Sequence, residues 1–157
     1  MNVADRRQKA IDNFMNGYNC SQSVVLAFSD LTELDESTLS KLSSPFGGGM
    51  GRLREVCGAI TGMFIIAGLI FGYEGAETGE IKAELYARIQ KLGGNFEAKR
   101  GTLICRELLG LDKRGISHDS SAPEARTAEY YAKRPCPGIV GDAAGILAEY
   151  LAERNIQ

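Results

Sequence analysis

The sequence lacks the features that would point to several common classes of protein. Its 18 basic and 20 acidic side chains give a formal net charge of −2, and the basic ones are scattered. This charge pattern indicates neither nucleic acid nor an anionic membrane surface as a partner. The chain has one histidine and no C-x-x-C pair. A thioredoxin-type pair, a zinc-ribbon knuckle and a C-x-x-C-H haem attachment site are therefore excluded.

Long hydrophobic runs are also missing. The most apolar stretch, residues 56–71, contains three glycines and a threonine and is short for a transmembrane helix. Residues 1–7 are charged and are not followed by the apolar core of a secretory signal. We therefore expect no membrane span and a cytoplasmic location.

The composition predicts one globular domain over residues 1–157. Of these residues 44% are hydrophobic and 24% are charged, which is ordinary for a folded domain. Sustained period-two alternation, the signal of a half-buried strand, does not occur, whereas apolar residues recur at helical spacing. We expect an all-α, single-domain helical bundle of about six or seven helices.

Apolar stripes and capping residues place these helices along the chain. The predicted segments are 3–16, one beginning at 19–21, 35–42, 52–71, 76–92, one within 96–109, 123–133 and 138–153. Gly93-Gly94 is predicted to end the helix that begins at 76. Ile81, Leu85, Ile89 and Leu92 are predicted to face inward from that helix. The glycines within 52–71 predict that a neighbouring element packs closely against it.

Four cysteines carry most of the chemical information: Cys20, Cys57, Cys105 and Cys136. Each lies on or near a different predicted helix, so they can act together only if the fold gathers them. Cys20 and Cys136 stand at predicted helix starts, where the helix dipole favours a thiolate, and we expect them to be the more exposed, lower-pKa thiols. Cys57, on the most apolar helix, is assigned a ligand or resolving role. The alternative is four inert, buried thiols.

Four segments in order resemble a known family. These are residues 18–24 around Cys20, the glycine-rich residues 46–51 leading to 57–62, residues 102–110 around Cys105, and Cys136 before the last helix. Together they resemble the family of redox-active proteins named for its C…GCAxxG…C…C pattern, over roughly residues 10–150. One detail departs from the pattern, because Gly58 follows the cysteine of the central block instead of preceding it.

The resemblance implies a shared cysteine centre. A similar domain in split-Soret cytochromes is associated with an iron–sulfur cluster, which implies cluster ligation by Cys20, Cys57, Cys105 and Cys136 here. Four thiolates also suit zinc, and a disulfide pair with two supporting thiols needs no metal. The resemblance implies redox activity with an unknown electron donor or acceptor.

The glycine-rich segment suggests a second kind of contact. Gly47, Gly48 and Gly49, with Gly58 after Cys57, are the positions where the backbone would approach a cofactor. The loop could also form an anion-binding nest helped by Arg52 and Arg54, although no G-K-[ST] follows as in a P-loop. Close passage of the chain beside Cys57 is the simpler explanation.

Three functions remain open from the sequence. The leading one is a redox or electron-transfer protein with a four-cysteine centre, in which all four cysteines matter. The second is a thiol enzyme with one nucleophilic cysteine and His118 or a carboxylate as base. The third is a non-catalytic helical protein that binds a partner. A homo-oligomer is compatible with each of them.

Overall fold

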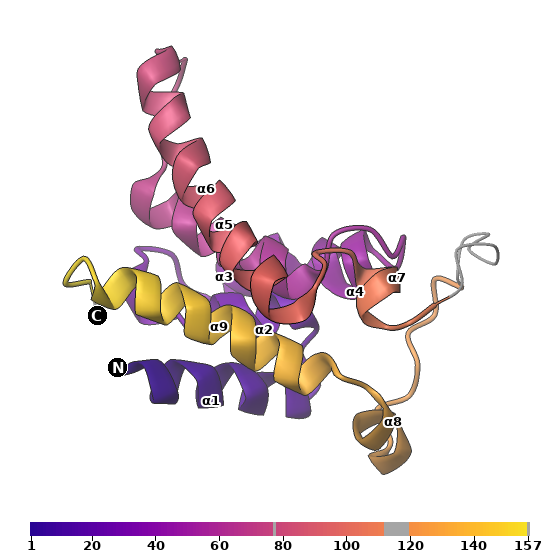
Figure 1. Ribbon diagram of the computed structural model, residues 1–157. Coiled ribbons are helices and arrows are strands. Elements are labelled where there is room, and N and C mark those ends of the chain that lie inside the picture. The colour runs from indigo at the N-terminus through magenta and orange to yellow at the C-terminus, as the bar shows by residue number, and fades with distance from the viewer. Residues whose placement is uncertain (77, 112–119, 157) are drawn as a thin grey trace.

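The computed structural model describes residues 1–76, 78–111 and 120–156, and their regular secondary structure is helical (Figure 1). The helices are α1 (Val3–Met15), α2 (Cys20–Leu26), α3 (Glu36–Ser43), α4 (Gly47–Met50), α5 (Gly58–Phe71), α6 (Gly79–Arg100), α7 (Cys105–Leu108), α8 (Ala128–Lys133) and α9 (Cys136–Ala152), with short 3₁₀ turns at Ser29–Leu31 and Ser44–Phe46. Within the described residues, the β pairing is a single antiparallel bridge between Val56 and Ile104. The all-α prediction is confirmed.

The core forms where α1, α2, α5 and α9 meet. Helix α9 is buried on most of its surface and runs alongside α1, while α2 packs between α1 and α5 (Figure 1). Phe14, Phe28, Met63 and Leu147 are almost completely buried. Each such side chain contributes about 1.5–3 kcal/mol through removal of apolar surface from water. This core fixes the starts of α2, α5 and α9 relative to one another.

A buried carboxylate joins three helices. Asp142 on α9 is 3% exposed and pairs with Arg7 on α1 and Arg100 on α6, each at 2.6 Å, and with Lys99 at 3.2 Å. The arginines lower the pKa of Asp142 against the opposing effect of burial, which is the largest single influence. The network holds α6 against the α1–α9 pair.

Helix α6 differs from its prediction in two ways. It continues through Gly93-Gly94 to Arg100 instead of ending there. Burial of Leu92 and Phe96 at 0% exposure outweighs the cost of two helical glycines, about 1 kcal/mol each. Ile81, predicted to face inward, is 43% exposed, because the first half of α6 projects from the body (Figure 1).

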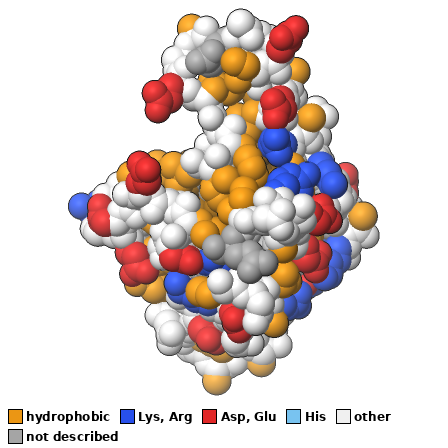
Figure 2. Space-filling model, turned by 90° about the vertical axis from the view of Figure 1, so that its left-hand side faces the viewer, with side chains coloured by type: hydrophobic (Ala, Val, Ile, Leu, Met, Phe, Trp, Pro, Cys, Tyr) orange, Lys and Arg blue, Asp and Glu red, His pale blue; other side chains and the backbone are white. Residues whose placement is uncertain are grey.

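Exposed apolar side chains lie on α5 and on the projecting half of α6. Leu69 of α5 and Tyr86 of α6 are 42% and 54% exposed, and Figure 2 shows hydrophobic side chains gathered on the face below the projecting end of α6. Among the described residues, no helix is both long enough and apolar enough to cross a lipid bilayer.

Helix α5 begins at Gly58, six residues later than predicted. The reason is a left-handed backbone over residues 48–54. Gly48, Gly49, Met50, Gly51 and Arg52 have φ of 65°, 70°, 65°, 61° and 66°, and Arg54 has 60°. This conformation costs an L-residue about 1–2 kcal/mol, and glycine avoids the cost. We call residues 48–54 the left-handed segment.

Backbone hydrogen bonds hold this segment against the chain around α7. The N–H of Arg106 donates to the carbonyl oxygen of Arg54 at 3.2 Å, and the N–H of Cys105 donates to that of Glu55, the residue after the segment, at 2.6 Å. The N–H of Cys57 donates to the carbonyl oxygen of Leu103 at 2.9 Å. The segment therefore ties two cysteine-bearing stretches together.

Candidate functional site

Each of the four cysteines stands at the start of a helix. Cys20, Cys105 and Cys136 are the first residues of α2, α7 and α9, and Cys57 caps α5. All four are free thiols. Cys57 and Cys105 are buried, whereas Cys20 and Cys136 are half-buried. The prediction that Cys20 and Cys136 are the more exposed thiols is confirmed.

Cys20 and Cys57 lie together as an interacting pair of thiols. The Cys20 sulfur lies against Gly58, the residue after Cys57, and the Cys57 thiol and the backbone N–H groups of Gly48 and Ser21 favour its thiolate as hydrogen-bond donors. Chiefly through the Cys57 hydrogen bond, and against the effect of burial, these contacts lower the pKa of Cys20 from 9.0 to about 6. The same bond, together with burial and the Cys20 charge, raises the pKa of Cys57 well above its ordinary value. The pair thus holds one thiolate and one thiol at neutral pH.

Gly58 makes room for this pair. A Cβ at that position would lie 2.5 Å from the Cys20 sulfur and 2.6 Å from the Phe46 carbonyl oxygen. Gly62, one turn later, would meet the Ser21 carbonyl oxygen at 2.7 Å. The predicted close approach to this helix is therefore confirmed at both positions, with α2 as the neighbour. Gly68 has no neighbour within 4 Å and does not share this role.

Cys105 lies against the left-handed segment. A Cβ at Gly49 would lie 2.5 Å from the Cys105 Cβ. The buried Arg54 places its Nη1 3.8 Å from the Cys105 sulfur. Burial raises the pKa of Cys105, and the Arg54 guanidinium opposes that rise.

Cys136 behaves differently from its prediction. Burial, followed by the negative charge on Cys20, raises its pKa from 9.0 to about 11, although Arg134 and Arg126 oppose the change. The expectation of a low pKa at Cys136 is therefore wrong, because the desolvated sulfur faces another thiolate. The corresponding expectation of a low pKa at Cys20 agrees with its pKa of about 6.

Cys20 and Cys136 open onto one cavity of about 440 Å³. Cys57 and Cys105 do not form part of its wall. Among the described residues, the charged side chains in the wall are Arg52, Arg54, Glu124, Arg126 and Arg134. The cavity is thus lined by two thiols and four guanidinium groups with one carboxylate.

Of the glycines named from the sequence, Gly47 and Gly48 line this cavity. Gly47 passes Asn19, where a Cβ would meet Nδ2 at 2.7 Å, and Gly48 passes the Arg52 side chain at 2.8 Å. They approach the start of α2 and the arginines, and Gly49 approaches Cys105. Of the four, Gly58 packs against the Cys20–Cys57 pair, and Gly48 approaches Cys20 through its backbone N–H. Backbone contact with a cofactor at Gly47, Gly48, Gly49 and Gly58 stays a prediction.

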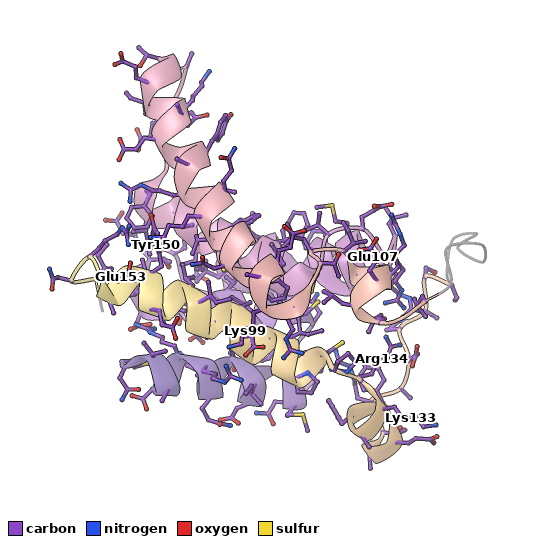
Figure 3. The ribbon with its side chains drawn as sticks, viewed as in Figure 1. Lys99, Glu107, Lys133, Arg134, Tyr150 and Glu153 are labelled. Carbon is purple, nitrogen blue, oxygen red and sulfur yellow. The ribbon has the colours of Figure 1, made fainter. Side chains whose placement is uncertain are left out.

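Sequence reasoning missed the arginines that come from distant segments. Arg126 and Arg134 reach the cavity from the chain around α8, and the only sequence signal was Arg134 standing two residues before Cys136. Figure 3 shows Arg134 beside the start of α9. Arg106, which directly follows Cys105, instead pairs with Glu55 at 3.2 Å. His118 lies outside the described residues.

No three His, Cys, Asp or Glu residues of the described ranges form a group that could hold one metal ion. The four cysteines are nevertheless electrostatically coupled, since the Cys20 charge raises the pKa of Cys57 and Cys136. The arrangement brings one hydrogen-bonded pair together and leaves Cys105 and Cys136 as neighbours of that pair.

Comparison with known proteins identifies the family. The family model described as "Putative redox-active protein (C_GCAxxG_C_C)" matches residues 18–150. No curated protein and no solved structure matches the chain. The matched range contains all four cysteines and most of the chain, so the protein belongs to the C_GCAxxG_C_C family.

Proposed function

We propose that the protein is a thiol–disulfide redox protein in which Cys20 and Cys57 form a reversible disulfide. The pairing of these two cysteines carries this proposal, because the Cys20 sulfur lies against Gly58, directly after Cys57, and the pair joins a half-buried thiol in the cavity wall to a buried thiol outside that wall. This arrangement suits an attacking cysteine in front and a resolving cysteine behind.

The chemistry balances with a disulfide as the two-electron oxidant. The Cys20 thiolate attacks one sulfur of the substrate disulfide, forms a mixed disulfide and releases the other half as a thiolate. Cys57 then loses its proton and attacks Cys20, which forms the Cys20–Cys57 disulfide and releases the second half. Two thiols of the protein are oxidised, and one disulfide is reduced to two thiols.

The electrostatics of the pair favour this order of events. Two of the four influences that raise the pKa of Cys57 are the hydrogen bond to Cys20 and the Cys20 charge. Both disappear once Cys20 is in a mixed disulfide. The first step therefore lowers the pKa of Cys57 and makes its thiolate accessible for the second.

Oxidation by bis(2-hydroxyethyl) disulfide, followed by peptide mapping, tests the proposal. The expected product is a single Cys20–Cys57 disulfide. Cys57→Ser is expected to accumulate a mixed disulfide on Cys20, and Cys20→Ser is expected to form neither product. Random pairing among the four cysteines, or an adduct mainly on Cys136, would contradict the proposal.

An iron–sulfur cluster held by Cys20, Cys57, Cys105 and Cys136 is the second candidate. Four free thiols at four helix starts are favourable donors, and in a four-iron cluster each thiolate binds its own iron, so the sulfurs need not meet at one ion. The cluster would supply one-electron transfer. The side chain of Ser21, next to Cys20, has a buried hydroxyl with no partner among the described residues.

Anaerobic reconstitution with iron and sulfide separates the two candidates. Bound iron and sulfide with visible charge-transfer absorption, lost in each of four single Cys→Ser variants, would favour the cluster. A colourless protein with four titratable thiols would favour the dithiol. Zinc would bind without colour and would be found by elemental analysis.

A further inference from the structure

We infer that the cavity selects anionic, low-molecular-weight disulfides as substrates for the Cys20–Cys57 pair. This inference rests on the proposed dithiol function and adds the chemical class of the substrate. Four arginines and one glutamate are the charged side chains that the described residues contribute to the cavity wall. Its volume of about 440 Å³ is within the range of small-molecule sites, roughly 300–1,000 Å³.

Arg126 is held in a fixed position by aromatic rings and backbone. Its guanidinium carbon lies 4.3 Å from the ring centroid of Phe14 and 5.0 Å from that of Tyr130. Its two terminal nitrogens donate to the carbonyl oxygens of Phe14 and Tyr18, each at 3.3 Å. No carboxylate of the described residues pairs with it. Its positive charge is therefore oriented at the cavity without a neutralising partner there.

Arg134 extends the positive wall toward the thiols. Its guanidinium carbon lies 5.2 Å from the Tyr130 ring centroid, and it pairs with the exposed Glu124. Its charge lowers the pKa of both Cys136 and Cys105, so its field reaches the sulfurs. Guanidinium groups hydrogen-bond carboxylates through paired donors, which suits a disulfide whose two halves end in carboxylates.

The thiolate of Cys20 makes this positive wall necessary for such a substrate. A negative sulfur alone would repel an anionic disulfide. The arginines of the cavity wall oppose this repulsion, and a positively charged cleft raises association rates of anions by about 10-fold to 10³-fold. A cationic disulfide is disfavoured by the same field.

Three disulfides of similar size and different charge test the inference. They are 3,3′-dithiodipropionate, bis(2-hydroxyethyl) disulfide and cystamine, with two negative, zero and two positive charges. The rate of Cys20–Cys57 disulfide formation with each is divided by its rate with 2-mercaptoethanol, which removes differences in intrinsic reactivity. The dianion is expected to react about tenfold or more faster than the dication at low salt. Raising the ionic strength to 1 M is expected to remove most of that preference.

Two arginine variants test whether the cavity wall causes the preference for the anionic disulfide. Arg126→Gln is expected to reduce the ratio of dianion to dication rates at least severalfold. Arg154→Gln is the matched control, since Arg154 also packs on a tyrosine, 3.5 Å from the Tyr150 centroid, and donates to a backbone carbonyl, but lies beyond the far end of α9. It is expected to leave the ratio unchanged. If Arg126→Gln does not fold, the salt dependence of the unmodified protein decides the question.

Different results would overturn the charge selection and the proposed dithiol function. Equal normalised rates for all three disulfides, with the Cys20–Cys57 disulfide still formed, would overturn the charge selection and leave the dithiol function standing. Absence of the Cys20–Cys57 disulfide with every probe would overturn the proposed function and this inference with it.

Discussion

Cys20 and Cys136 occupy matching positions and have opposite chemistry. Each is half-buried, each is the first residue of a helix, and both line the same cavity. The pKa is about 6 for Cys20 and about 11 for Cys136. The pKa of Cys20 is lowered by hydrogen bonding from Cys57 and from backbone N–H groups. The pKa of Cys136 is raised by burial and by the neighbouring Cys20 thiolate. Donors aimed at the sulfur, more than position on a helix, determine which thiol ionises.

The largest expected effect is in thiol reactivity. At pH 7, iodoacetamide is expected to alkylate Cys20 roughly 10–100-fold faster than Cys136, since the gain in thiolate fraction exceeds the loss of intrinsic nucleophilicity. Time-resolved labelling with peptide mass spectrometry measures both rates. Labelling after unfolding provides the control, because the two rates should then agree. Faster labelling of Cys136 in the native protein would reverse the comparison.

The same two residues should make the stability of the protein change with pH in opposite directions. The lowered pKa of Cys20 means that its stabilisation is complete above about pH 9 and is lost as the pH falls through about 6. The raised pKa of Cys136 means that stability is lost as the pH rises from about 9 through about 11.

Urea unfolding under reducing conditions measures both trends. The free energy of unfolding of the unmodified protein relative to Cys20→Ser is expected to rise by about 2–4 kcal/mol between pH 6 and 9. Relative to Cys136→Ser it is expected to fall by about 1–3 kcal/mol between pH 9 and 11. A flat difference for either variant would contradict the corresponding pKa.

Glycine substitutions test how the sulfurs are surrounded. Gly49→Ala is expected to cost about 2–4 kcal/mol, because φ is +70° and the new methyl would meet Cys105 Cβ at 2.5 Å. Gly58→Ala is expected to cost about 1–3 kcal/mol and to disturb Cys20 directly. Gly94→Ala, with no neighbour within 4 Å, is the control and is expected to stabilise by up to about 1 kcal/mol. Urea midpoints report all three, and a neutral Gly49→Ala would show that the segment can move aside.

The smallest effect concerns the two arginines near Cys105. Arg106→Gln is expected to change stability by less than about 1 kcal/mol, because its pair with Glu55 is solvent-exposed. It should leave the alkylation rate of Cys105 unchanged. Arg54→Met is expected to slow that alkylation, because the guanidinium that lowers the pKa of Cys105 is lost, and Arg54→Lys should partly restore it. An effect of Arg106 larger than that of Arg54 would contradict the assignment.

Local patterns predicted part of this molecule. Apolar periodicity located the helices, and Asn19 indicated the start of α2, where its side chain accepts from the Gln22 N–H at 2.9 Å. The glycines after Cys57 predicted a close neighbour, which is α2. These features depend on residues a few positions apart, and their physical causes are therefore present in the sequence itself.

Other parts depend on contacts across the fold. The glycine-rich residues 46–51 indicated a loop, but Met50, Arg52 and Arg54 are residue types that rarely adopt positive φ, so the extension of the left-handed segment to residue 54 and the late start of α5 had no sequence signal. The high pKa at Cys136 arises from its burial in the folded chain and then from the charge on Cys20, more than a hundred positions away. Arg126 reaches the cavity only because Phe14 and Tyr130 hold it there.

The pairing of α1 with α9 has a consequence for synthesis of the chain. The first helix of the structure completes its packing only against the last, and the cavity wall likewise combines Cys20 with Cys136. Contacts of such high sequence separation form late in folding. A nascent chain that has not yet reached residue 136 therefore displays Cys20 without the wall that selects its partners. During that interval the emerging polypeptide depends on the reducing capacity of its surroundings to keep the thiol free.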